Sequence, residues 1–169
     1  MKRYLTIILT AAGACALQAQ TDPLSTEAKQ AYNGIKNNLI KMAEKMPDEN
    51  YSFKASPDIR TFGALVGHIA DAQMGTCSAV NGQPKQGGAS SKTSKADLVN
   101  ALKASFEECD TAYASLTDAT ATQMIKTRHG ERSKLGTLVG NTVHDNEEYG
   151  YMSVYLRLKG VVPPSSEGR

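Results

Sequence analysis

This sequence has no strong excess of either positive or negative charge. Of its 169 residues, 19 are basic and 17 are acidic, which gives a net charge of +2. Lys2 and Arg3 belong to an N-terminal segment that we expect to be removed, and 17 basic residues then face 17 acidic ones. The sequence also lacks a basic run and a row of aromatic side chains. These absences argue against nucleic-acid binding.

The short motifs of several enzyme classes are absent as well. The sequence contains no GxSxG elbow, no HExxH pair and no CxxC pair. Gly87-Gly88 is not followed by Lys-Ser/Thr, so the chain has no phosphate-binding loop. A P-loop nucleotide hydrolase, an α/β-hydrolase, a zincin and a thioredoxin-like oxidoreductase are therefore excluded.

Cysteine is scarce, with three residues in the chain. Cys15 lies in the N-terminal segment, which leaves Cys77 and Cys109 in the remaining domain. In an oxidising compartment an even pair indicates a disulfide between two helices. Two free cysteines buried as small apolar residues are the alternative. The spacing leaves both readings open.

The N-terminal segment has the layout of a secretory signal. Lys2 and Arg3 precede an apolar run over residues 4–12, and small residues follow. We expect a signal peptide over residues 1–19, a domain over residues 20–169, no membrane span after processing, and a periplasmic or secreted product. A lipoprotein anchored through Cys15 and an uncleaved anchor are the alternatives.

Apolar residues recur at helical spacing in four segments, residues 23–46, 60–80, 94–116 and 133–159. Asp22 before Pro23 predicts a helix cap, and Ser94 with Asp97 resembles a capping box. No stretch alternates at period two over a useful length, and residues 117–132 show no clear period. The sequence therefore predicts an all-α four-helix bundle.

Three side chains could form a metal site. His144 and Glu148 are four residues apart and share one helix face. His68 lies on the apolar side of the second predicted helix. If the helices converge, these side chains offer a three-ligand site for a divalent cation. Otherwise, His68 is a hydrogen-bonded core residue and the other two form a solvated ion pair.

Further polar residues could support such a site. The expected partners of the imidazoles are Asp71, Asp145 and Glu147. Tyr151 or Tyr155 could line a pocket beside it. His129, in TRHGER, is expected at the surface and not as a fourth ligand.

The segments RTFGALVGHIADAQ and HDNEEYGYMSVYLRLKGVVPP resemble the DinB-like superfamily of four-helix bundles, and the likeness spans residues 25–164. This resemblance implies a long crossover between the second and third helices. Many members hold a divalent metal, often nickel or zinc, through three histidines. His68 and His144 match two of them, and Glu148 takes the place of the third. A carboxylate there shifts the preference toward harder ions, such as manganese or iron.

The resemblance and the residues together predict an exported, metal-dependent enzyme of hydrolase or transferase type, acting on an unknown small molecule. Related bundles include thiol-dependent transferases and a relative of maleylpyruvate isomerase. The alternative is a non-catalytic helical binding or stress-response module with a degraded metal site. Because relatives often pair, a homodimer is also expected.

Overall fold

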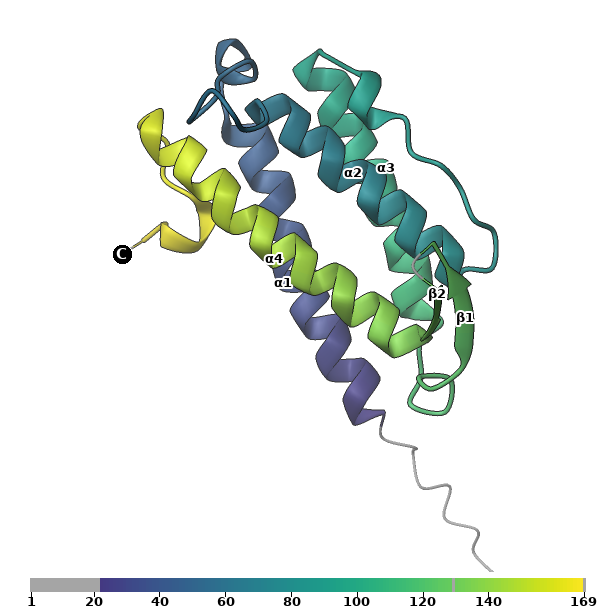
Figure 1. The fold of residues 1–169 in the computed structure, drawn as a ribbon. Helices are drawn as coiled ribbons and strands as arrows, with labels where there is room; N and C mark the ends of the chain where they lie inside the picture. Colours follow the sequence, from purple (N-terminus) through teal and green to yellow (C-terminus); the bar gives the residue numbers. More distant parts are fainter. Residues whose placement is uncertain (1–21, 129, 169) are drawn as a thin grey trace, which may run out of the picture.

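The computed structural model describes residues 22–128 and 130–168 and contains the predicted four-helix bundle (Figure 1). The α-helices are α1 (Pro23–Lys45), α2 (Phe62–Val80), α3 (Lys95–Ala114) and α4 (Lys134–Leu158). Short 3₁₀ turns, η1 (Asp48–Asn50), η2 (Ala89–Ser91) and η3 (Pro164–Ser166), interrupt the loops. The expected signal peptide and His129 lie outside the described residues.

The helices pack with the crossover that the resemblance implied. In Figure 1, α1 and α4 run in one direction, and α2 and α3 run in the other. The segment 81–94 therefore returns along the length of the bundle, packed on α2. Gly67 of α2 makes this close packing feasible, because a Cβ there would lie 3.1 Å from the carbonyl oxygen of Ala89.

The core is built from the apolar faces of the predicted helices, and on α1 the set of buried residues differs from the predicted one. Leu39, Met42 and Met46 are fully buried, as their spacing predicts. Leu24 belongs to the same run of helically spaced apolar residues but is 54% exposed, whereas Tyr32 is buried and donates a hydrogen bond to the carbonyl of Phe106 at 3.0 Å. A tyrosine reaches the core because its hydroxyl finds a partner there.

The α1 cap differs from the one predicted. The Asp22 side chain does not cap its own helix and accepts instead from the backbone N–H of Asp118, at 2.9 Å. Asp118 in turn accepts from the N–H groups of Ser25, at 2.8 Å, and Leu24, at 3.2 Å. The cap of α1 thus comes from a distant turn, which local sequence spacing cannot reveal. The Ser94 cap of α3 is present, since Ser94 Oγ accepts from Asp97 N at 3.1 Å.

The connection before α4 holds a β-hairpin that the sequence did not predict. Strands β1 (Met124–Thr127) and β2 (Gly130–Ser133) pair antiparallel, with Ile125 opposite Arg132. Gly130 has a φ of 99°, which favours glycine at the turn. Each strand is four residues long and mostly exposed, so an alternating apolar pattern could not appear.

Cys77 of α2 and Cys109 of α3 form a disulfide, with Cα atoms 4.9 Å apart. Both cysteines are fully buried. The bond joins the two parallel helices about one turn before the C-terminal end of each. The structure thereby decides between the disulfide and the two free thiols.

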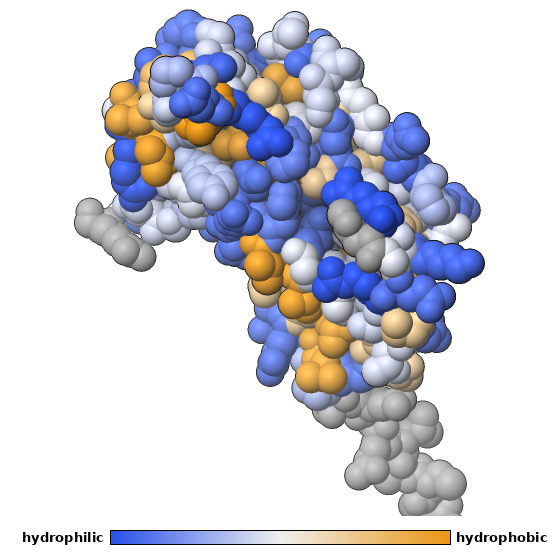
Figure 2. Space-filling view, viewed as in Figure 1, coloured by the Kyte–Doolittle hydropathy of each residue, from blue (hydrophilic) through white to orange (hydrophobic). Residues whose placement is uncertain are grey.

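Apolar side chains remain exposed along α4. They are Val139, Val143, Tyr151, Val154 and Leu158. In Figure 2, hydrophobic residues gather at two places along the course of α4. Surface patches of this kind are common at protein contacts. The homodimer stays a prediction. No helix within the described residues is long and apolar enough to cross a membrane.

Candidate metal site

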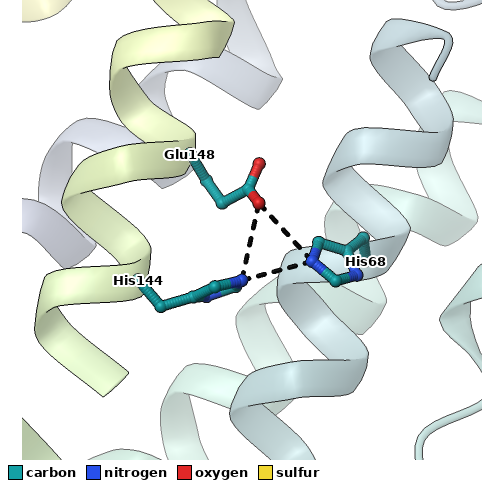
Figure 3. Close-up of side chains that lie close together, drawn as sticks. All are labelled: His68, His144 and Glu148. Carbon is teal, nitrogen blue, oxygen red and sulfur yellow. Dashed lines mark hydrogen bonds and ion pairs between the residues drawn. The ribbon is translucent and has the colours of Figure 1, made fainter. Parts of the chain in front are cut away.

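The side chains of His68, His144 and Glu148 converge between α2 and α4 (Figure 3). The two imidazole Nε2 atoms are 3.2 Å apart. Glu148 Oε1 lies 3.4 Å from Nε2 of His68 and 3.5 Å from Nε2 of His144. Three ligand atoms from two helices thus form a nearly equilateral triangle. The predicted convergence of the three side chains is present, and metal binding by them stays a prediction.

The size of this triangle fits a small divalent cation. In a tetrahedral site with metal–ligand distances of about 2.1 Å, neighbouring ligand atoms lie about 3.4 Å apart. In an octahedral site with the same distances, this separation is about 3.0 Å. The observed separations of 3.2–3.5 Å are closer to the tetrahedral value. Two imidazoles and one carboxylate are a known donor set for zinc.

The chemistry of the three atoms also favours a cation. Each of them can offer a lone pair, and one proton shared among the three atoms can bridge only two of them. Glu148 is 5% exposed, and its second oxygen, Oε2, is buried and has no hydrogen-bond partner among the residues that the structure describes. A buried carboxylate normally has its charge compensated. A divalent ion would supply that compensation.

Asp145 lies behind His144, on the side away from the triangle. It is fully buried, and its Oδ1 is 3.8 Å from Nδ1 of His144, which is an electrostatic contact and too long for a hydrogen bond. The Asp145 carboxylate raises the pKa of His144, and burial of the imidazole opposes this effect. A carboxylate in this position favours a proton on Nδ1 and leaves the Nε2 lone pair directed into the triangle.

The other two groups have pKa values shifted in the directions that keep them uncharged. Burial lowers the pKa of His68, as do the positive charges of Arg60 and Arg128 and the neighbouring imidazole. Burial likewise raises the pKa of Glu148. His68 is therefore available as a neutral ligand, and Glu148 gains from a cation that stabilises its ionised form.

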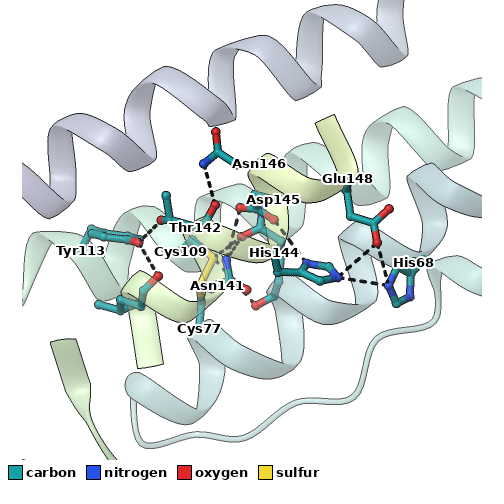
Figure 4. A network of polar contacts seen from close by, with 12 residues as sticks. His68, Cys77, Cys109, Tyr113, Asn141, Thr142, His144, Asp145, Asn146 and Glu148 are labelled. Carbon is teal, nitrogen blue, oxygen red and sulfur yellow. Dashed lines mark hydrogen bonds and ion pairs between the residues drawn. A yellow bond between two sulfur atoms is a disulfide. The ribbon is translucent and has the colours of Figure 1, made fainter. Parts of the chain in front are cut away.

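A buried polar chain links Asp145 to the disulfide (Figure 4). Asn141 Nδ2 lies 2.7 Å from Gln73 Oε1 and 3.4 Å from Asp145 Oδ2. Gln73 Oε1 is 3.0 Å from Sγ of Cys109, and since a disulfide sulfur carries no hydrogen, this is a contact and not a hydrogen bond. This polar chain runs from α4 through Gln73 of α2 and ends at the disulfide.

Four of the expected supporting residues have other roles. The Asp71 carboxylate accepts from the N–H groups of Ala89, at 2.7 Å, and Ser90, at 2.9 Å, and so holds the loop before α3. Tyr151 is exposed and donates to Glu147 at 3.0 Å. The remaining one, Tyr155, donates to the carbonyl of Arg60. Of the three acids expected beside the imidazoles, Asp145 alone directly faces a ligand imidazole.

Sequence reasoning missed Gln73 and Asn141. Both are buried, and both lie on helix faces that otherwise carry core residues. The available signal was a polar amide at a core position of each helix, since buried amides need partners.

The comparisons with known proteins agree with this fold. The family model described as "DinB superfamily" matches residues 32–152. No protein of curated function matches this sequence.

Solved structures with similar folds share little sequence with this chain. A DinB-like protein from Bacillus cereus ATCC 10987 has a TM-score of 0.69 at 20% identity, covering 82% of this chain and 95% of that one. A conserved protein from Enterococcus faecalis has a TM-score of 0.57 at 13% identity, covering 79% and 96%.

A variant of a mycothiol-dependent maleylpyruvate isomerase has a TM-score of 0.60 at 12% identity, and the match covers 72% of this chain and 59% of the isomerase. At these identities the likeness concerns the fold. The family match, which spans most of the described chain, and the helix order together show that the protein belongs to the DinB superfamily.

Proposed function

We propose that this protein is a divalent-metal-dependent enzyme of hydrolase or transferase type, with the metal held by His68, His144 and Glu148. The observation that carries the proposal is the convergence of two Nε2 atoms and one carboxylate oxygen within 3.2–3.5 Å of one another. Zinc fits these separations best, and nickel, iron and manganese are the alternatives.

The residues around the triangle have distinct roles in this proposal. When bound, such an ion would supply a Lewis acid that lowers the pKa of a coordinated water to about 7. His68 and His144 would coordinate as neutral imidazoles, and the Asp145 carboxylate would keep the second one oriented. A cavity that reaches both imidazoles would admit the substrate. These are binding and orienting tasks, for which side chains held on packed helices are well suited.

Metal analysis tests the proposal. We expect about one equivalent of a divalent metal in protein purified without a histidine tag, and its loss in the His68→Ala and Glu148→Gln variants. Glu147→Gln is the matched control, because Glu147 is the exposed neighbour of Glu148, is not one of the three converging residues and accepts a hydrogen bond from Tyr151. Elemental analysis of the four proteins gives the result.

Absence of metal from every preparation, including protein dialysed against zinc, nickel, iron or manganese, would contradict the proposal. That outcome would favour the non-catalytic helical module.

Metal affinity should also decrease as the pH is lowered. Protons compete with the metal for His144, whose pKa is raised by Asp145, so competition begins at a higher pH than for an ordinary histidine. We expect the association constant to decrease steadily between about pH 8 and about pH 6. Competition with a chelating dye measures it, and circular dichroism checks that the fold persists. An affinity that stays constant over this range would be incompatible with imidazole ligands.

We further propose that the chain is exported. The charged and apolar layout of its N-terminal segment supports this, and so does the oxidised cysteine pair, since disulfides persist in oxidising compartments. Mass spectrometry of the mature protein should find an N-terminus at Gln20. An N-terminus at Met1, or a lipidated Cys15, would refute cleavage after Ala19.

A further inference from the structure

A cavity of about 780 Å³ lies against the candidate metal site. Its walls come from α2, the loop segment 84–87, the β-hairpin and α4. His68 and His144 are part of the lining, so a bound molecule would reach the triangle directly. A volume of this size is typical of small-molecule sites.

The lining of this cavity is strongly cationic. Its basic residues are Lys85, Lys126, Arg128 and Arg132, and its one acidic residue is Asp71. The Asp71 carboxylate is already engaged by backbone N–H groups of the loop. In Figure 2, hydrophilic residues surround the hairpin on the face shown. Without Lys2 and Arg3 the chain has 17 basic and 17 acidic residues, so this excess of positive charge is local to the cavity.

Two of these cations have little compensating charge of their own. Lys85 pairs with Glu108 at 2.6 Å, whereas no carboxylate of the described residues lies within ion-pairing distance of Lys126 or Arg132. Glu131 is opposite Lys126 in the hairpin register but does not reach it. Cations in such a position attract anionic ligands.

Arg132 packs against α4 beside Gly140. A Cβ on Gly140 would lie 3.7 Å from Nη2 of Arg132, so the guanidinium covers the helix at this point. Its weak 3.5 Å hydrogen bond to the carbonyl of Gly136 leaves other N–H groups for a ligand. A guanidinium binds carboxylate and phosphate groups through paired hydrogen bonds.

We propose that the cavity binds a small anionic substrate, whose carboxylate or phosphate group is held by Arg132 and attracted by the nearby positive charge of Lys126. The rest of the molecule then extends along α2 and α4 toward His68 and His144. Its role as a substrate rests on the proposed function, whereas anion binding does not depend on a metal. The basic lining of the cavity thereby favours anionic molecules over neutral or cationic ones at the binding step.

Anion binding is tested on metal-free protein with two probes, inorganic phosphate and succinate, followed by NMR chemical shifts. We expect saturable binding of at least one probe, with affinity falling as NaCl is added. Arg132→Gln should weaken it about tenfold, and Lys126→Gln together with Arg132→Gln should abolish it. The probe that binds more tightly distinguishes a phosphate from a carboxylate ligand.

Lys41→Gln is the matched control, because it removes the same charge from an exposed site on α1, which does not line the cavity. Lys126→Gln alone provides a second test if Arg132→Gln perturbs the hairpin. Equal affinities in the wild type and in all variants would overturn the proposal, as would a failure of both probes to saturate.

Metal content is measured on the same proteins, so the two proposals fail separately. Anion binding by protein that holds no metal would support this inference and contradict the proposed metal site. Bound metal together with equal anion affinity in all cavity variants would support the metal site and contradict this inference.

Discussion

Removing the disulfide should lower the free energy of unfolding by roughly 3–4 kcal/mol, the chain-entropy expectation for cysteines 32 residues apart. The bond between Cys77 and Cys109 closes a loop that contains the long crossover, and this loop gains much freedom in a reduced, unfolded chain. For a domain of this size, the melting temperature should fall by roughly 10 °C. Urea unfolding of oxidised and reduced wild-type protein measures the effect without changing a side chain.

The Cys77→Ala/Cys109→Ala variant separates the cross-link from the packing. Both sulfurs are fully buried, so the variant should be less stable than reduced wild type by the cost of the small cavities left behind. Thiol titration of the mature protein in denaturant should find no free cysteine. Two titrating thiols, or equal urea midpoints for the oxidised and reduced forms, would be inconsistent with a stabilising disulfide.

Asp145→Asn should have opposite consequences for metal binding and for the metal-free fold. The carboxylate faces Nδ1 of His144 and favours the tautomer that presents Nε2 to the triangle. An amide cannot provide this charge, so metal affinity should fall about 10–100-fold. Stability without metal should stay the same or rise by up to about 1 kcal/mol, because a fully buried charge is removed.

Calorimetric metal titration and urea unfolding at pH 8 test both parts, with Glu147→Gln as the control that changes an exposed acid on the same helix. An unchanged affinity would show that Asp145 does not orient its neighbour. A loss of more than about 2 kcal/mol from the metal-free protein would mean that this carboxylate serves the fold instead.

The sequence was most informative where helical periodicity was long. The buried faces of α1 to α4 repeat over 19–25 residues, and patterns of this length identify a helix reliably. The four-residue strands of the hairpin are too short and too exposed to carry any such pattern. The Asp118 cap is a contact between residues more than 90 positions apart, which local spacing does not encode.

The features of the candidate site likewise fall into those that spacing along one helix determines and those that packing determines. His144 and Glu148 share a face by helix geometry, so the sequence alone determined that pair, together with the all-α fold and the polar residues that α4 carries. The approach of His68, the burial of Asp145 and the cationic cavity depend on how α2, α4 and the hairpin pack. Only the tertiary structure decided them, because packing of distant segments sets the separation of their side chains, whereas spacing along one helix sets only their direction.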